Sequence, residues 1–137
     1  MVTMKRLEIL LLEDDMARVV AFKKRMEQSG RDHYINHVET AVYAIDCLKV
    51  NKYDMILLDH DLGGRTYVDH TNEREDCGMR VAEYFSIRPE QVRTHGPIIV
   101  HSLNGPAAQQ MVELIGEAIW APFVWQREIW EKYITIK

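Results

Sequence analysis

The chain has 137 residues, of which 47% are hydrophobic and 28% are charged, a composition typical of one globular domain with a buried core. We therefore expect a single domain over residues 1–137. The formal net charge is -4 at pH 7, so the chain lacks the basic excess that binds a phosphate backbone, and autonomous DNA binding is not expected. No apolar run approaches the roughly 20 residues of a membrane span, and no secretion signal opens the chain, so we expect a cytoplasmic protein without a membrane partner.

Apolar runs alternate with amphipathic stretches along the chain. The first run, at residues 7–12, is nearly continuous, which favours a parallel strand that is covered on both faces. The stretch at 16–29 has the periodicity of a helix, and Gly30 is placed to end it. Thr40 is placed to cap a second helix over residues 41–51. The chain thus opens as strand, helix, strand and helix.

The remaining elements continue the same alternation. Further strands are expected at 33–39, 53–61, 97–102 and 118–123, and further helices at 77–87, at 106–118 and from about residue 124. Five successive strand–helix units predict a doubly wound α/β domain, because parallel neighbours need right-handed crossovers that place helices on both faces of the sheet. The expected fold is a five-stranded parallel sheet between helices.

Acidic and polar side chains follow three of the predicted strands where those strands end. Residues in these positions are Glu13 and Asp14 after the first strand, Asp59 and Asp61 after the third, and His101 and Ser102 after the fourth. Because the carboxyl ends of parallel strands meet at one crevice, we expect them to share a site. Clustered carboxylates repel one another unless a cation neutralises them, so Glu13, Asp14 and Asp59 predict a divalent metal. The alternative is a solvated cluster that caps a helix.

The identity of the metal depends on the histidines. Oxygen ligands alone suit Mg²⁺, whereas an imidazole from His60 or His101 shifts the preference toward Mn²⁺. Strand alternation would send His60 to the face opposite Asp59 and His101 to the face opposite Ser102, so either ring could instead pack behind the site. His33, His37 and His95 cluster with nothing, and we interpret them as surface or structural residues.

Three stretches in this order resemble the receiver domain of two-component response regulators: ILLLEDD at 9–15, YDMILLDHD at 53–61 and PIIVHS at 97–102. The resemblance implies a flavodoxin-like fold. It also implies roles for the site residues: Glu13 and Asp14 as magnesium-binding acids, Asp59 as phosphoacceptor, the Asp61 carbonyl as a metal contact and Ser102 as the switch residue. Receivers carry a lysine after the fifth strand that pairs with the phosphoryl group, but WAPF at 120–123 places Ala121 there. This departure argues against phosphoaspartate signalling.

A narrower resemblance lies in LDHDLGG at 58–64 and VHSLNGPAAQQM at 100–111, which are similar to the receiver-like cyclic-phosphate-processing family. That resemblance implies a metal-dependent domain that hydrolyses or processes a small phosphorylated ligand or an RNA end carrying a cyclic phosphate. Two alternatives stay open. One is a stand-alone response regulator phosphorylated on Asp59, and the other is a non-catalytic pseudo-receiver that binds a protein partner.

The hydrolase hypothesis assigns catalysis to His60, His101 and Asp59. A metal polarises the phosphoryl oxygens and activates water, while a histidine protonates the departing alkoxide. The segment at 63–76 is longer than most connections between strand and helix, which is typical of a binding loop. Candidate substrate-binding residues are Arg65, His70 and Arg74 in this segment and Asn104 after the fourth strand. The alternative for the segment is a disordered polar insertion.

Overall fold

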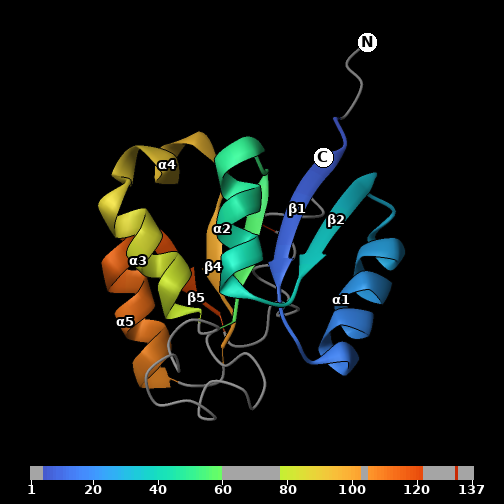
Figure 1. Cartoon of the computed structure of the whole chain (residues 1–137). Helices are drawn as coiled ribbons and strands as arrows, with labels where there is room; N and C mark the ends of the chain where they lie inside the picture. The colour runs from blue at the N-terminus through green and yellow to red at the C-terminus, as the bar shows by residue number, and fades with distance from the viewer. Residues whose placement is uncertain (1–4, 60–77, 103–104, 122–131, 133–137) are drawn as a thin grey trace.

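The computed structural model describes residues 5–59, 78–102, 105–121 and 132. Its described strands form one five-stranded parallel sheet in the order β2-β1-β3-β4-β5 (Figure 1). The strands are β1 (Leu7–Leu12), β2 (His33–Val38), β3 (Met55–Leu58), β4 (Ile98–Val100) and β5 (Ala118–Trp120). The helices are α1 (Met16–Ser29), α2 (Ala41–Val50), α3 (Met79–Ile87), α4 (Pro89–Thr94) and α5 (Gly105–Ile115). The predicted doubly wound α/β fold is confirmed.

Each face of the sheet has its own hydrophobic core, as the continuous apolar strands predict. On one face, alternate residues of β1, β3 and β4 pack against α2, α3, α4 and α5, with Phe85 fully buried. On the other face, the intervening residues pack against α1, which contributes Val19, Phe22 and Met26. Burying both faces of the central strands fixes the register of their carboxyl ends, which is where the candidate site lies.

Helix ends agree with the sequence signals where those signals are strong. Asp15 caps α1 by accepting hydrogen bonds from the backbone N–H groups of Ala17 and Arg18, and Gly30 ends the helix with φ +75°. Thr40 caps α2 through the N–H of Tyr43, as predicted.

Two helix predictions need correction. α4 was not predicted, because a six-residue helix of which only Val92 is buried shows no periodicity. α5 ends at Ile115 and not at residue 118, because Gly116 adopts the left-handed conformation with φ +92° and stops the helix. Of the closing helix expected from about residue 124, the structure describes Lys132 alone, which is helical.

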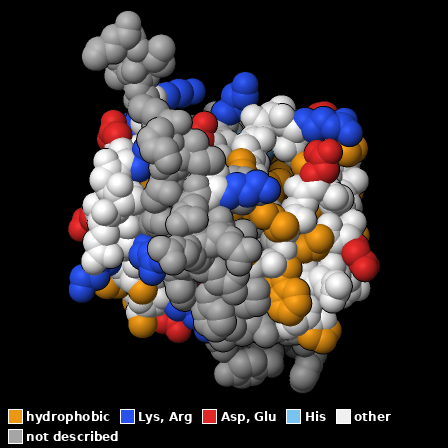
Figure 2. All heavy atoms as spheres, turned by 180° about the vertical axis from the view of Figure 1, so that it is seen from behind, with side chains coloured by type: hydrophobic (Ala, Val, Ile, Leu, Met, Phe, Trp, Pro, Cys, Tyr) orange, Lys and Arg blue, Asp and Glu red, His pale blue; other side chains and the backbone are white. Residues whose placement is uncertain are grey.

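The described surface bears on two expectations about partners. No described helix is long and apolar enough to span a bilayer. On the face shown in Figure 2, the described Lys and Arg side chains are scattered among acidic and apolar ones and form no continuous basic patch.

Candidate metal centre

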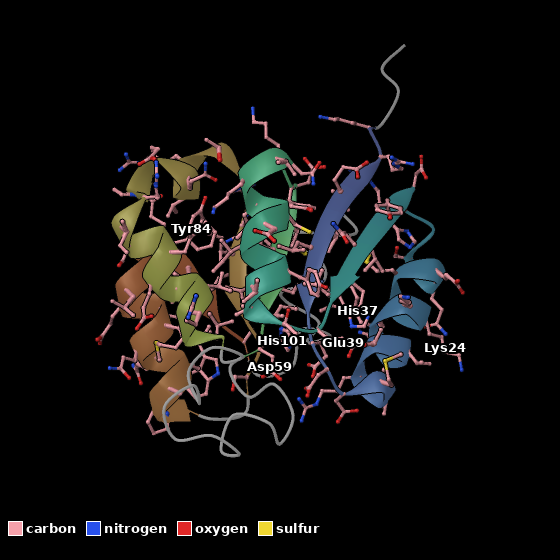
Figure 3. The ribbon with its side chains drawn as sticks, viewed as in Figure 1. Lys24, His37, Glu39, Asp59, Tyr84 and His101 are labelled. Carbon is pink, nitrogen blue, oxygen red and sulfur yellow. The ribbon has the colours of Figure 1, made fainter. Side chains whose placement is uncertain are left out.

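Three buried polar side chains meet at the carboxyl ends of β1, β3 and β4. Glu13, Asp59 and His101 each offer one ligand atom, and these atoms all lie within 4.8 Å of one another. The three residues are 1%, 1% and 3% exposed. Figure 3 shows Asp59 and His101 together at the strand ends, just below the arrowheads of the sheet. In a sheet of order β2-β1-β3-β4-β5 this is the switch point, where neighbouring crossovers diverge and ligands bind.

Strand register places these side chains side by side. Leu12 pairs with Leu58, and Leu58 pairs with Val100, so the residues that follow them form the next row of the sheet. The row continues the ladder: Asp59 N–H donates to the Leu12 carbonyl at 3.1 Å, and His101 N–H donates to the Leu58 carbonyl at 2.9 Å. The backbone of the sheet therefore fixes the spacing of the site, which does not depend on loop conformation.

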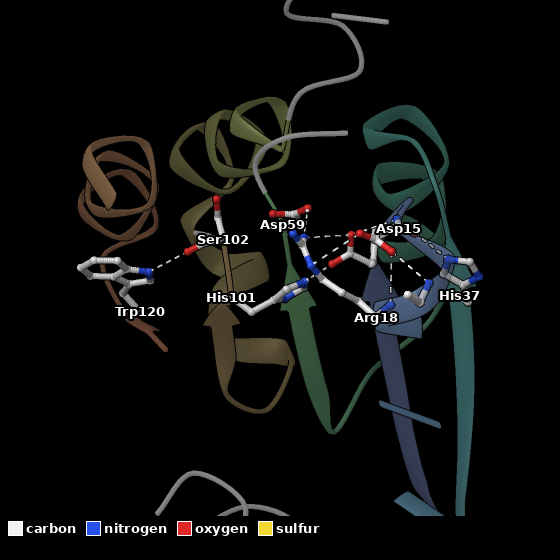
Figure 4. A network of polar contacts seen from close by, with 9 residues as sticks. Asp15, Arg18, His37, Asp59, His101, Ser102 and Trp120 are labelled. Atoms are coloured by element: carbon white, nitrogen blue, oxygen red, sulfur yellow. Dashed lines mark hydrogen bonds and ion pairs between the residues drawn. The ribbon is translucent and has the colours of Figure 1, made fainter. Parts of the chain in front are cut away.

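The same row extends to β5 and ends in an apolar group. Ala121 N–H donates to the Val100 carbonyl at 2.9 Å, which aligns Ala121 with His101, and Ala121 is 3% exposed. The position where the receiver resemblance implies a lysine thus contributes only a buried methyl group. Ser102, one residue beyond the row, is fully buried, and its carbonyl accepts a hydrogen bond from Trp120 Nε1 at 2.9 Å (Figure 4).

Both carboxylate oxygens and the carbonyl oxygen of Glu13 have polar contacts. Its Oε1 lies 2.9 Å from His101 Nε2, and its Oε2 accepts a hydrogen bond from the Asp15 N–H at 3.0 Å. His37 Nε2 lies 2.6 Å from the Glu13 carbonyl oxygen, so this histidine supports the backbone of the site. Burial raises the pKa of Glu13, but the hydrogen bonds from His101 and from the Asp15 N–H, together with the charge of Arg18, outweigh it and hold the pKa below its ordinary value. Glu13 is therefore ionised at neutral pH.

His101 points toward the acids and not behind them. Its Nε2 contacts Glu13 Oε1, and its ligand atom lies within 4.8 Å of those of Glu13 and Asp59. His101 Nδ1 has no hydrogen-bond partner among the described residues. The alternative that the His101 ring packs behind the site is therefore wrong.

Arg18 supplies a positive charge that the sequence did not single out. Its Nη1 lies 3.5 Å from Glu13 Oε2 and 3.5 Å from Asp59 Oδ2, and its Nε lies 3.9 Å from Asp15 Oδ2 (Figure 4). The helix α1 carries several basic residues, and nothing in their spacing distinguishes this one. The one feature of the sequence that could have predicted this contact is the position of Arg18 in the first turn of α1, directly after the acidic cap Asp15.

The acids that follow the first and third strands are of two kinds. Asp15 is exposed and caps α1, which fits the capping alternative, whereas Glu13 and Asp59 are buried and do not. Asp14 is half-buried and is not among the three convergent residues, so its role as a metal ligand stays a prediction. Other predicted site residues lie outside the described residues, namely His60, Asp61, Arg65, His70, Arg74 and Asn104.

The fold and this row of side chains define the chain as a receiver-type α/β domain. A family model described as the cyclic-phosphate processing receiver domain matches residues 9–117, so the chain belongs to that family. No curated protein matches the chain at a significant level.

Solved receiver structures share the fold at low identity. The receiver domain of sensor histidine kinase PA1611 from Pseudomonas aeruginosa, described with magnesium in its active-site cleft, is 19% identical, with a TM-score of 0.68 over 96% of this chain and 100% of that chain. The phosphorylated cyanobacterial phytochrome response regulator RcpA is 18% identical, with a TM-score of 0.67 over 96% of this chain and 90% of that one. The Mn²⁺-bound response regulator Rcp1 is 18% identical, with a TM-score of 0.63 over 94% and 89%.

Proposed function

We propose that this receiver domain binds a divalent cation with Glu13, Asp59 and His101 and processes a cyclic phosphate, either on a small nucleotide or at an RNA end. The observation that carries the proposal is the convergence of these three buried side chains, with their ligand atoms within 4.8 Å. The family description names cyclic-phosphate processing, and two similar receivers are described with magnesium or manganese.

The donor set fits a divalent cation. Ligand atoms about 2.1 Å from a shared Mg²⁺ lie about 3 Å apart when adjacent and about 4.2 Å apart when opposite, so the observed cluster needs only small side-chain adjustments. Two carboxylates suit Mg²⁺, and the imidazole favours Mn²⁺. A bound cation would polarise a phosphoryl oxygen and lower the pKa of a coordinated water.

Glu13 and His101 set the proton chemistry of the site. We assign the Nε2 proton of His101 to its bond with Glu13 Oε1, which leaves the lone pair on Nδ1. Because Nδ1 has no hydrogen-bond partner among the described residues, its lone pair is the one that could coordinate a cation or accept a proton from an attacking water. Glu13 orients the ring for either task, with its own backbone supported by His37.

Product analysis by chromatography tests the proposal. The substrates are 2′,3′- and 3′,5′-cyclic nucleotides and RNA with a terminal cyclic phosphate, each with Mg²⁺ or Mn²⁺. We expect cation-dependent turnover that falls by about 10²- to 10⁴-fold in Asp59→Asn and His101→Asn. Matched controls are Asp46→Asn, an exposed acid on α2, and His33→Asn at the start of β2, which should keep full activity. A wild type that turns over none of these substrates would contradict the proposal.

Phosphorylation of Asp59 is the second candidate. It is supported by the position of Asp59 directly after β3 and by the phosphorylated response regulator among the similar structures. Against it, Ala121 contributes a methyl group where a phosphoryl oxygen would need a cation. Intact mass after incubation with acetyl phosphate distinguishes the two functions, since stable stoichiometric phosphorylation would favour the response regulator. If neither activity is found, the non-catalytic module that binds a protein partner takes precedence.

A further inference from the structure

We infer that Arg18 binds the phosphate group of the ligand at this site. The inference rests on the proposed function, because it takes the anionic part of the ligand to be a phosphate. Glu13 and Asp59 place two buried carboxylates in one row, and a bound phosphate adds further negative charge beside them. Positive charge beyond that of a metal is needed to hold the anion there.

Arg18 lies where this charge is needed. It belongs to the first turn of α1, which begins three residues after Glu13, and its side chain extends across the strand ends toward Asp59 (Figure 4). Its Nη1 is equally distant, at 3.5 Å, from one oxygen of each buried carboxylate. Ala121, at the β5 end of the row, contributes no charge.

The contacts of Arg18 are too long to saturate its donors. Its ion pairs measure 3.5, 3.5 and 3.9 Å, whereas charge-assisted hydrogen bonds are about 2.7–2.9 Å long. Charge attraction thus holds the guanidinium near the acids without committing its planar fork to short bonds. That fork can donate two parallel hydrogen bonds to two oxygens of one phosphate group.

Accessibility favours the same role. The Arg18 side chain is 33% exposed, whereas those of Glu13 and Asp59 are 1% and 2% exposed, so a ligand arriving from solvent meets the guanidinium first. Glu13 separates the two functions: its Oε1 faces His101 and its Oε2 faces Arg18. His101 and Arg18 therefore contact different oxygens of Glu13.

Calorimetric titration of three ligands separates anion binding from metal binding. The probes are Mg²⁺ alone, then inorganic phosphate and 2′,3′-cyclic AMP, each added to the Mg²⁺-saturated protein. In Arg18→Gln we expect phosphate and cyclic AMP to bind about 10- to 100-fold more weakly, the usual effect of losing charge-assisted hydrogen bonds. Mg²⁺ should bind as tightly or more tightly, because a positive charge 3.5 Å from both carboxylates has been removed. Arg18→Lys keeps the positive charge but loses the guanidinium fork, so its affinity for phosphate should lie between those of wild type and Arg18→Gln.

The control is Lys24→Gln, which removes one positive charge from the exposed side of the same helix (Figure 3) and should change nothing. Equal phosphate affinity in wild type and Arg18→Gln, or no phosphate binding by wild type, would overturn the inference. An equal loss of Mg²⁺ and phosphate affinity would also overturn it, because Arg18 would then be supporting the acids. Arg18-dependent phosphate binding without turnover of any cyclic phosphate would support the role of Arg18 and contradict only the proposed function.

Discussion

Replacing Asp59 by Asn should uncouple the stability of the fold from divalent cations. The substitution keeps the shape of the side chain and removes one of the two buried negative charges of the site. In wild type, a cation that binds only the folded state raises the free energy of unfolding by about 2.7 kcal/mol at a concentration of about 100 Kd. The question is how much of this gain the variant keeps.

Coulomb energies give the expected effect of Asp59→Asn on the free energy of unfolding when no cation is bound. Unit charges at the 4.8 Å limit of the cluster repel by about 3.5 kcal/mol at an effective dielectric constant of about 20. Arg18, 3.5 Å away, attracts Asp59 by about 4.7 kcal/mol on the same scale, and its exposure to solvent reduces this figure. Because the two terms nearly cancel, Asp59→Asn should change the free energy of unfolding by less than about 1.5 kcal/mol in divalent-free buffer.

When a cation is bound, its attraction for Asp59 exceeds both the repulsion from Glu13 and the attraction to Arg18. A divalent charge at the distance of Arg18 would attract Asp59 by about 9.5 kcal/mol, and a fourfold reduction for screening leaves about 2 kcal/mol, or a roughly 30-fold weaker affinity. At the concentration that stabilises wild type by about 2.7 kcal/mol, the variant should therefore gain only about 0.9 kcal/mol.

Urea unfolding with and without Mg²⁺ measures both numbers. Asp46→Asn removes an exposed acid from α2 and should keep the full wild-type gain. If Asp59→Asn gains as much from Mg²⁺ as wild type does, Asp59 is not part of a metal centre and the reasoning is refuted.

Two further predictions concern residues away from the site. Burial lowers the pKa of His95, whose Nδ1 accepts the Tyr53 N–H at 3.1 Å, so the stability that its neutral ring provides is complete above about pH 6.5 and is lost as the pH falls through the lowered value. Unfolding free energies of His95→Gln should accordingly fall less steeply than those of wild type between about pH 7 and 5, and identical slopes would contradict this. Gly96→Ala would drive a Cβ into the Asp54 carbonyl, so we expect a loss of about 3 kcal/mol or more in urea unfolding, and a neutral result would refute the close approach.

The sequence predicted the sheet because each central strand is apolar along its whole length. Runs such as residues 7–12 can be buried only between two helical layers, and the observed β1 has five of its six residues buried. Short helices were harder to predict from the sequence. The helix α4 buries only Val92, so tertiary contacts and not periodicity determine it.

The sequence predicted which acids meet at the candidate site, but it did not predict the direction of His101 or the contact of Arg18. Glu13 and Asp59 follow apolar strands, and parallel strand ends meet, so their proximity follows from topology alone. The direction of His101 depends on which face its row shares with the acids, and the register that decides this is set by packing across the sheet. Arg18 reaches the acids from a helix, a contact that no spacing along the chain encodes.

Anomalous diffraction from crystals grown with Mn²⁺ addresses the proposed metal centre most directly. We expect one manganese peak bounded by Glu13, Asp59 and His101, at about 2.0–2.3 Å from their ligand atoms. The same data from Asp59→Asn crystals should show that peak weakened or lost. A wild-type map at saturating Mn²⁺ with no peak at these three residues would contradict the proposal that they form a metal centre.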